Sequence, residues 1–343
     1  MRFPILPLAL CAVLSALAPA GAQAQPAPGV VGWTVTEAKP ARTLSLTIWY
    51  PAASGGSAVK VGANAVFAGA VGRKDAPVAK GRFPLVLLSH GGLRSAADSG
   101  AWLAARLAAA GYVVVAEHGP RLGPKAAAQA VAEIARRSAD LTTALDAVQR
   151  NSLLRPHLSA GKTAVVGVFL GGTAALSLAG ARLDPRAVAA SCDSAGTGID
   201  CGWFKARGFD LHQADLAPLS RPAADKRITA AIAIAPEYAT GFTPASLAAL
   251  QVPVEVIDLG RPDTRPEGMS GAALKGTSQR LHYTEVTGAS RFDAFSRCTD
   301  KGAAILEDSG ADAAICAQGG PARVAAHAAL ALAVLDFLGQ KLR

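Results

Sequence analysis

The sequence predicts an α/β fold in which a doubly wound, mostly parallel sheet forms a single domain. From residue 83 onward, short continuous apolar runs alternate with segments of helical periodicity, which is typical of parallel strands joined by crossover helices. The runs lack a polar alternation, which indicates strands buried on both faces. With 51% hydrophobic and 17% charged residues, the 343-residue chain has enough apolar surface for a core and is not intrinsically disordered.

The N-terminal 24 residues have the pattern of a cleavable signal peptide. Met1-Arg2 is a short positive region, residues 3–17 are apolar, and Ala22-Gln23-Ala24 forms an A-x-A cleavage site before Gln25. A membrane anchor would need a longer apolar span with charged flanks. The sequence therefore predicts a periplasmic or secreted protein, not an integral membrane protein, with one domain over residues 25–343.

Two strand-like runs, Val30–Val35 and Leu44–Tyr50, come before the regular alternation, and the Gly/Ser/Ala-rich stretch 52–71 predicts an irregular excursion. The alternation begins with a buried strand at Phe83–Ser89. An Ala-rich amphipathic helix at Ala96–Ala110 follows and is closed by Gly111. The next elements are a strand at Tyr112–Ala116, one or two helices within Ala126–Arg150, a strand at Thr163–Val168 and a helix at Gly171–Ala181.

Residues 184–226 interrupt this rhythm. They hold two cysteines, Trp203 and many charged residues, and they predict a cap-like insertion over the sheet. Strands then resume, and a helix with apolar residues at helical spacing closes the chain. The predicted ranges are Ile228–Ile234, Val254–Leu259 and Leu281–Val286 for the strands and Pro321–Leu342 for the helix.

The net charge of +9 comes from Lys and Arg residues that are spread along the chain. No block of five basic residues occurs, and no aromatic residues interleave with the basic ones. A basic soluble surface therefore explains the charge better than nucleic-acid binding does. Neither a cofactor nor a metal ion is expected.

Four cysteines remain after removal of the signal peptide: Cys192, Cys201, Cys298 and Cys316. Four cysteines allow three pairings. In an oxidising compartment the local pairs Cys192–Cys201 and Cys298–Cys316 are favoured, each closing a Gly/Asp-rich loop. A metal site is the rival interpretation, but neither a C-x-x-C motif nor a nearby His supports it.

Two glycine-containing turns carry the signal for function. The strand at 83–89 runs into His90-Gly91-Gly92, which resembles the loop that supplies an oxyanion-hole N–H in α/β-hydrolases. The strand at 163–168 runs through Gly167, Phe169, Leu170, Gly171 and Gly172 into a helix, as a G-x-S-x-G nucleophile elbow does. The glycines stand where a sharp turn needs residues without Cβ. The central residue, however, is Phe169 and not Ser.

The whole mature chain resembles the bacterial secreted α/β-hydrolases related to platelet-activating-factor acetylhydrolase and dienelactone hydrolase. The segments that carry the resemblance occur in the same order over about residues 40–340, and the two cysteine pairs fall where such proteins also carry them. They are FPLVLLSHGG at 83–92, GYVVVAEHGP at 111–120, TAVVGVFLGGTAALSLAGARLD at 163–184, VPVEVIDLGRPD at 252–263 and TGASRFDAFSRC at 287–298. The resemblance implies an α/β-hydrolase fold and a protein of the carboxylic-ester hydrolase type.

The same resemblance places the catalytic triad at positions that have lost their chemistry. Phe169 stands where the nucleophilic Ser belongs, and Arg291 stands where the His of a G-A-G-H-F segment belongs. A guanidinium group, whose pKa lies above about 12, cannot act as a general base. The acid position is Ala235 in the acetylhydrolase-like branch and Asp263 in the dienelactone-like branch. Asp263 is thus the one chemically competent triad residue, and only on the second alignment.

Other residues could replace the lost groups only if the fold brings them together. In the chain order of this fold the His comes late, which leaves His282 in a predicted strand and His327 on the C-terminal helix. Both are more simply explained as core or surface residues. Ser89, Ser177 and a lone Asp263 carboxylate remain as alternative nucleophiles, none of them with an obvious paired base.

A binding pocket is expected to survive the loss of the triad. The N–H of Leu170, at a helix N-terminus, and an N–H of the Gly91-Gly92-Leu93 loop, oriented by His90, should converge on one point that suits an anion or a carbonyl oxygen. Phe169 is expected to project into this space, and Arg291 to add positive charge beside it. The implied partner is a small acyl- or ester-like ligand or a protein.

Three functions are compatible with the sequence. The first is a degenerate hydrolase that binds without turnover, which Phe169 and Arg291 at the mouth of one cleft would favour. The second is an active esterase with a rearranged site, which would need a Ser–His–acid cluster elsewhere with contacts within about 3.2 Å. The third is an extracytoplasmic protein that uses only the surface of the fold, which a filled cleft and an exposed apolar patch would favour.

We expect non-reducing peptide mapping of the exported protein to recover the linked pairs Cys192–Cys201 and Cys298–Cys316, because an oxidising compartment stabilises such local bridges. Reduction before digestion is the control and should separate both pairs. Crossed pairs, or free thiols at all four positions, would contradict both the pairing and the location outside the cytoplasm.

Overall fold

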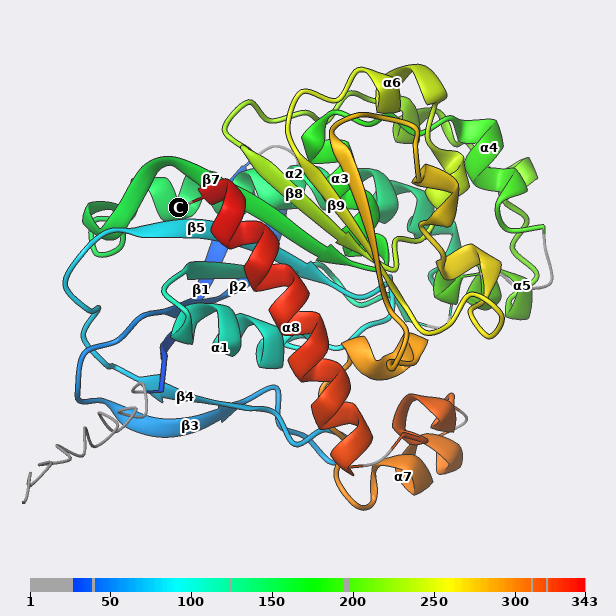
Figure 1. Ribbon diagram of the computed structural model, residues 1–343. Coiled ribbons are helices and arrows are strands. Elements are labelled where there is room, and N and C mark those ends of the chain that lie inside the picture. The colour runs from blue at the N-terminus through cyan, green and yellow to red at the C-terminus, as the bar shows by residue number, and fades with distance from the viewer. Residues whose placement is uncertain are drawn as a thin grey trace, which may run out of the picture.

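In the computed structural model, ten strands form one sheet (Figure 1). The structure describes residues 27–38, 41–123, 125–193, 198–309, 311–318 and 320–342, and the predicted signal peptide lies outside these ranges. The strands are β1 (Gly29–Ala38), β2 (Ala41–Tyr50), β3 (Ser57–Val61), β4 (Ala70–Lys74), β5 (Phe83–His90), β6 (Val113–His118), β7 (Leu158–Val168), β8 (Ala230–Ile234), β9 (Val254–Leu259) and β10 (Leu281–Val286).

The strand order is β10-β9-β8-β7-β5-β6-β2-β1-β4-β3. The six strands from β10 to β6 in this order pair in parallel, whereas β1 and β2 form an antiparallel hairpin beside β6. The predicted doubly wound, mostly parallel sheet is therefore confirmed.

Helices cover both faces of the sheet. Figure 1 shows α1 (Ala101–Ala109) and α8 (Gly320–Leu342) together on one face, and α2 (Ala130–Arg150) and α3 (Leu170–Ala179) pack against each other on the other face. Successive residues of β5 alternate between two cores, with Leu87 in the core under α2 and α3 and Leu88 in the core under α1 and α8. Because both faces of the strand are buried, its sequence is a continuous apolar run.

The segment 184–226 carries α4 (Pro185–Ala190) and α5 (Ile199–Ala206). The disulfide Cys192–Cys201 joins the end of α4 to α5, with 5.2 Å between the Cα atoms. The disulfide Cys298–Cys316 lies beside α7 (Gly302–Asp308). Both bridges that the sequence favours are thus present. The remaining helix, α6 (Pro244–Ala248), precedes β9.

The structure departs from the sequence-based prediction in two places. The stretch 52–71, expected to be irregular, contains β3 and the start of β4, which pair as a hairpin. No residue of β3 is fully buried, so the strand lacks the apolar pattern by which strands are recognised. The helix α1 begins at Ala101 and not near Ala96, because Asp98 has a φ of 59°, and a left-handed residue does not continue a right-handed helix.

Among the described residues, α8 is the one helix long and apolar enough to cross a membrane by length and composition. In the structure its buried side chains pack on the sheet and on α1. The ring of His327 stacks on Trp102 of α1 with 3.7 Å between centroids, and the guanidinium of Arg323 pairs with Asp293 inside the protein at 3.0 Å. These contacts are those of a core helix.

Candidate functional site

The adjacent strands β5 and β7 lead into helices on opposite faces of the sheet, α1 and α3. In doubly wound folds, ligands bind in the crevice that such a pair leaves at the carboxyl ends of its strands. The two loops predicted to carry function meet here, since the N–H of Gly91 donates to the carbonyl of Val168 at 3.1 Å. The structure therefore brings the His90–Leu93 loop and the turn at Phe169 together.

Phe169 joins β7 to α3 with φ 56° and ψ −121°, a conformation that costs about 1–3 kcal/mol for a residue with a side chain. The flanking glycines explain why the turn holds this shape. A Cβ on Gly167 would lie 1.9 Å from the carbonyl oxygen of Gly171, and a Cβ on Gly171 would lie 2.0 Å from that of Ser89. The turn has the positive φ of a nucleophile elbow, as the motif predicts.

The side chain of Phe169 is fully buried (0% exposed). Its ring centroid lies 5.5 Å from that of Phe295 and 6.1 Å from that of His90. Nε2 of His90 lies 2.8 Å from the carbonyl oxygen of Ala294, which anchors the loop after β5 to the segment after β10. Burial lowers the pKa of His90 to about 4, so its ring is neutral near pH 7. The place of a nucleophile is occupied by an apolar cluster.

The N–H groups of the predicted oxyanion loop are all engaged. Gly91 donates to Val168, as described above, and Gly92 donates to Oγ of Ser95 at 3.0 Å. Leu93 donates to the carboxylate of Asp200 in α5, at 3.0 and 3.2 Å from its two oxygens. One backbone carbonyl and two side chains of the protein itself therefore occupy the positions in which an anionic ligand would accept these bonds.

Asp200 is paired with a second buried carboxyl group, that of Glu237 after β8. Glu237 accepts the backbone N–H of Ile199 at 3.0 Å and that of Asp200 at 3.4 Å, and both carboxyl side chains are 0% exposed. The backbone N–H of Glu237 donates to the carbonyl of Phe169 at 3.3 Å. The pair thus fastens the insertion to the elbow and to the oxyanion loop.

Burial favours a protonated form of this pair. Burial raises the pKa of Asp200 to about 6, and burial together with the charge of Asp200 raises the pKa of Glu237 well above its ordinary value. The protonated form of Glu237 can donate a hydrogen bond to the Asp200 carboxylate. Arg137 and Arg94 favour the charged form of Asp200. The sequence did not predict this pair, because the insertion holds several acids and none is marked as the one that turns inward.

The triad positions are only partly brought together. Ala235 follows β8, is buried and has a φ of 42°. Arg291 is 39% exposed, lies 3.9 Å from the carboxylate of Asp312 and stacks on the ring of Phe292 at 4.5 Å. Its guanidinium is directed to the surface, which corrects the expectation of a positive charge beside Phe169. Asp263 is 59% exposed and forms a 2.8 Å ion pair with Arg261, so it does not serve the crevice.

A buried acid that sequence analysis did not single out is Asp258, near the end of β9. It pairs with Arg265 at 2.8 Å and accepts the hydroxyls of Tyr283 at 2.8 Å and Ser270 at 2.9 Å. With these partners it holds the loop that follows β9. The signal that could have identified it was an Asp within VEVIDL, a strand that is otherwise predicted to be buried.

One hydroxyl–imidazole–carboxylate cluster occurs outside the crevice, in Thr47, His118 and Asp98. Nε2 of His118 lies 2.9 Å from Oγ1 of Thr47 and 3.1 Å from Oδ1 of Asp98. Nδ1 accepts the backbone N–H of Asp98 at 3.4 Å, which assigns the ring proton to Nε2. A catalytic triad needs its acid and its nucleophile on different ring nitrogens, so this cluster is not one.

The other alternative nucleophiles have structural partners. Oγ of Ser89 donates to the carboxylate of Glu117 at 3.1 Å, and both side chains are buried. Oγ of Ser177 donates to the carbonyl of Thr173 at 3.0 Å. The late histidines serve neither hydroxyl: Nε2 of His327 lies 2.9 Å from the carbonyl oxygen of Phe295, and His282 is exposed on β10.

A cavity of about 230 Å³ lies between the insertion and the segment after β8. Phe169 and Arg291 do not line it. Its walls include Ser191, Cys201, Tyr238 and Glu267, and the buried hydroxyl of Tyr238 has no hydrogen-bond partner among the described residues. No group of three His, Cys, Asp or Glu side chains that could hold a metal ion occurs in the part of the chain that the structure describes.

No family model and no curated protein matches the chain. Solved structures do match its fold. The ferulic acid esterase from Streptomyces cinnamoneus is similar with a TM-score of 0.60 and 18% identity, over 95% of this chain and 92% of the esterase. The dienelactone hydrolase from Anabaena variabilis is similar with a TM-score of 0.51 and 15% identity, over 92% of this chain and 99% of the hydrolase. The chain has the α/β-hydrolase fold, as its sequence resemblance implied.

We expect Glu237→Gln to make the protein more stable relative to wild type as pH rises from 5 to 8. A carboxyl group that keeps its proton only in the folded state makes stability fall as pH rises above its unfolded pKa. Gln can donate to Asp200 without titrating. The stability difference between Glu237→Gln and wild type should therefore grow as the pH rises, measured by urea unfolding at a series of pH values.

The lowered pKa values of His90 and His327, both about 4, act in the opposite direction below about pH 6.5. They are present in wild type and variant alike, so the difference between the two proteins isolates Glu237. The control is Glu307→Gln, on an exposed position of α7. A difference that stays constant over the whole pH range would refute the shared proton.

Proposed function

We propose that this chain is a secreted protein of the carboxylic-ester hydrolase type that has lost catalysis and acts by binding. The observation that carries the proposal is the closed crevice. Phe169 is fully buried where a nucleophile would stand, and the carboxylate of Asp200 holds the N–H of Leu93.

Acyl transfer needs a nucleophile, a base that activates it and donors aimed at the developing oxyanion. The phenyl ring of Phe169 has no nucleophilic atom, and the guanidinium of Arg291 is directed to Asp312. The third requirement, a set of oxyanion donors, also fails. The N–H of Leu93 already binds the Asp200 carboxylate, whose negative charge would repel an oxyanion. The nucleophile, the base and a free N–H at Leu93 are thus all lacking at the positions where the family resemblance places them.

The cavity beside the insertion supports a small acyl- or ester-like ligand. Its volume of about 230 Å³ is below the ~300 Å³ at which typical ligand pockets begin, which favours a short chain. Tyr238 lines this cavity, and its buried hydroxyl lacks a partner among the described residues; a ligand carbonyl oxygen that reached this hydroxyl would satisfy it, which would favour binding. Binding of a protein partner is the alternative to binding of a small ligand, since a protein can bind to the surface of the fold without any catalytic group.

We expect the wild type to hydrolyse short p-nitrophenyl esters near the uncatalysed rate. Phe169→Ser alone should restore little, because a Ser without a base is a weak nucleophile. Phe169→Ser with Arg291→His should do better, and addition of Ala235→Asp better still on the acetylhydrolase-like alignment. Spectrophotometric release of p-nitrophenol measures each rate, and circular dichroism confirms that each variant is folded.

The result that would overturn the loss of catalysis is specific. It is hydrolysis by the wild type at an enzyme-like rate, abolished by Asp263→Asn or Ser89→Ala. A rearranged site would then be the correct account.

We expect methyl butyrate to bind without turnover and Tyr238→Phe to weaken its affinity about 3- to 10-fold, the value of one hydrogen bond. The same change should stabilise the free protein, since it removes a buried hydroxyl that lacks a partner. Calorimetric titration and thermal unfolding measure the two effects. The matched control Tyr283→Phe loses bonds to Asp258 and Glu285, so it should lower stability and leave affinity unchanged. Equal affinity in wild type and Tyr238→Phe would exclude this cavity.

A further inference from the structure

The strand β1 has an outer edge that is largely unpaired. It pairs with β2 over all ten of its residues, but on the other side it pairs with β4 only at Gly29 and Val30. Within the described ranges, no other strand pairs with residues 31–38. Free N–H and C=O groups along such an edge are a template for another strand.

Among the residues that the structure describes, this edge lacks Lys, Pro and bulges, which usually protect sheet edges, and no strand other than β2 covers residues 31–38. Residues 31–37 read VGWTVTE, with one charged side chain and no Pro, and the ladder to β2 runs without a shift of register. A Cβ added at Gly32 would meet nothing within 4 Å. By contrast β10, at the opposite end of the sheet, carries the ion pair of Glu285 with Arg265 at 2.8 Å.

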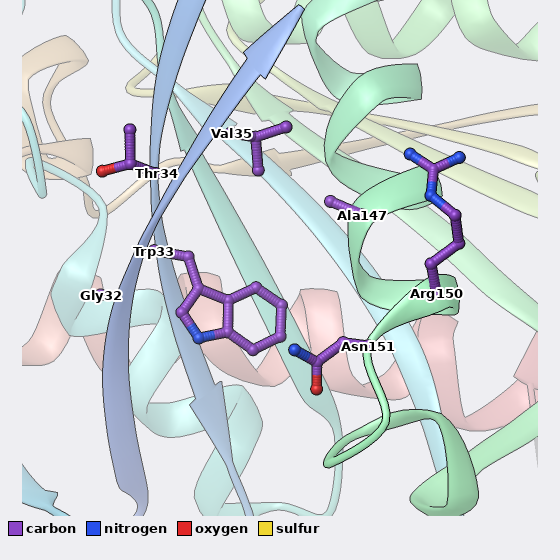
Figure 2. A pocket seen from close by; sticks show the side chains of 7 residues that line it. All are labelled: Gly32, Trp33, Thr34, Val35, Ala147, Arg150 and Asn151. Carbon is purple, nitrogen blue, oxygen red and sulfur yellow. The ribbon is translucent and has the colours of Figure 1, made fainter.

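A groove of about 510 Å³ runs beside this edge, between β1 and the C-terminal end of α2. Figure 2 shows Trp33 and Val35 projecting from β1 toward α2, where Ala147 faces them. Arg150 and Asn151 stand at the end of the helix (Figure 2). The groove therefore has apolar walls and a basic end, and it has room for the side chains of an added strand.

Acidic and basic side chains lie near opposite ends of β1, with Arg150 lining the groove and Glu37 beyond its other end. Glu37, at one end of β1, accepts a hydrogen bond from the hydroxyl of Thr143 in α2. Arg150, two turns further along α2, is 72% exposed and lies 3.6 Å from its partner Asp146. A second copy of β1 that lies antiparallel to the first therefore places its Glu37 near Arg150, at the basic end of the groove.

We propose that the β1 edge is the surface through which two copies of this chain associate, by antiparallel pairing of residues 31–37 with the same residues of the second copy. Thr34 is the middle residue, so a two-fold axis passes beside it and each Thr34 faces the other. On the groove side, Trp33 of one copy then lies opposite Val35 of the other. Glu37 of one copy lies opposite Val31 of the other, at the end where Arg150 stands.

A second copy fits this edge because the segment is complementary to itself. A two-fold interface uses one surface patch twice, and each copy supplies both the apolar side chains of residues 31–37 and the groove beside α2 that receives them. The same pairing joins the two sheets and covers both exposed edges. The proposal is independent of the loss of catalysis, since the edge lies on the far side of β6 and β2 from the crevice.

The test measures the mass of the full mature chain by light scattering and sedimentation over a range of concentrations. The wild type is expected to form a dimer. Thr34→Lys and Thr34→Glu each place two like charges opposite one another at the axis, and each is expected to weaken the dimer at least about fivefold. A one-to-one mixture of the two variants is expected to restore it, because Lys then faces Glu.

The matched control is Thr43→Lys, an exposed Thr in β2 that pairs with β1 but lies away from the free edge. It is expected to leave the dimer unchanged. A wild type that stays monomeric overturns the proposal, even if the edge binds a peptide from another protein. A dimer that Thr34→Lys leaves intact, or a mixture that does not recover, overturns it as well.

Discussion

The carboxylate of Asp200 accepts the hydrogen bonds on which the arrangement of the crevice depends. A charge in a dry interior is tolerated only with partners, and Asp200 has the N–H of Leu93 and the proton of Glu237. Glu237 in turn binds the first turn of α5 and, through its own N–H, the carbonyl of Phe169. This pair of buried carboxyl groups therefore links the insertion, the loop after β5 and the turn after β7.

The strained turn at Phe169 is maintained because the free-energy cost of its backbone strain and the free energy gained by burial of its side chain are of similar size. The left-handed backbone at Phe169 costs about 1–3 kcal/mol, and burial of a Phe ring contributes about 1.5–3 kcal/mol, with a further contribution from the contacts to Phe295 and His90. The close approach of Gly167 to Gly171 leaves the turn no room to relax. The turn therefore holds its positive φ as part of the packing of the core.

Local patterns predicted the sheet and both loops of the crevice. The continuous apolar runs mark β5, β6 and β8, and the C-terminal end of β7, within two residues of their observed ends, because strands buried on both faces must be apolar. The contents of the crevice could not be predicted in this way. Asp200 lies 107 residues after Leu93, and nothing in a charged insertion shows which acid will turn inward. The direction of the Arg291 side chain likewise depends on Asp312, which only the folded chain brings near it.

The position of one disulfide makes the crevice sensitive to how the protein is prepared. Cys201 follows Asp200 directly, and its bridge to Cys192 closes a loop of sequence separation 9. Such a cross-link removes conformational freedom from the segment it closes, so α5 is preorganised to present its carboxylate to Leu93. Protein made in a reducing cytosol would hold α5 by noncovalent contacts alone. Two samples of identical sequence would then differ in how firmly the crevice is shut, according to the oxidation state in which each was folded.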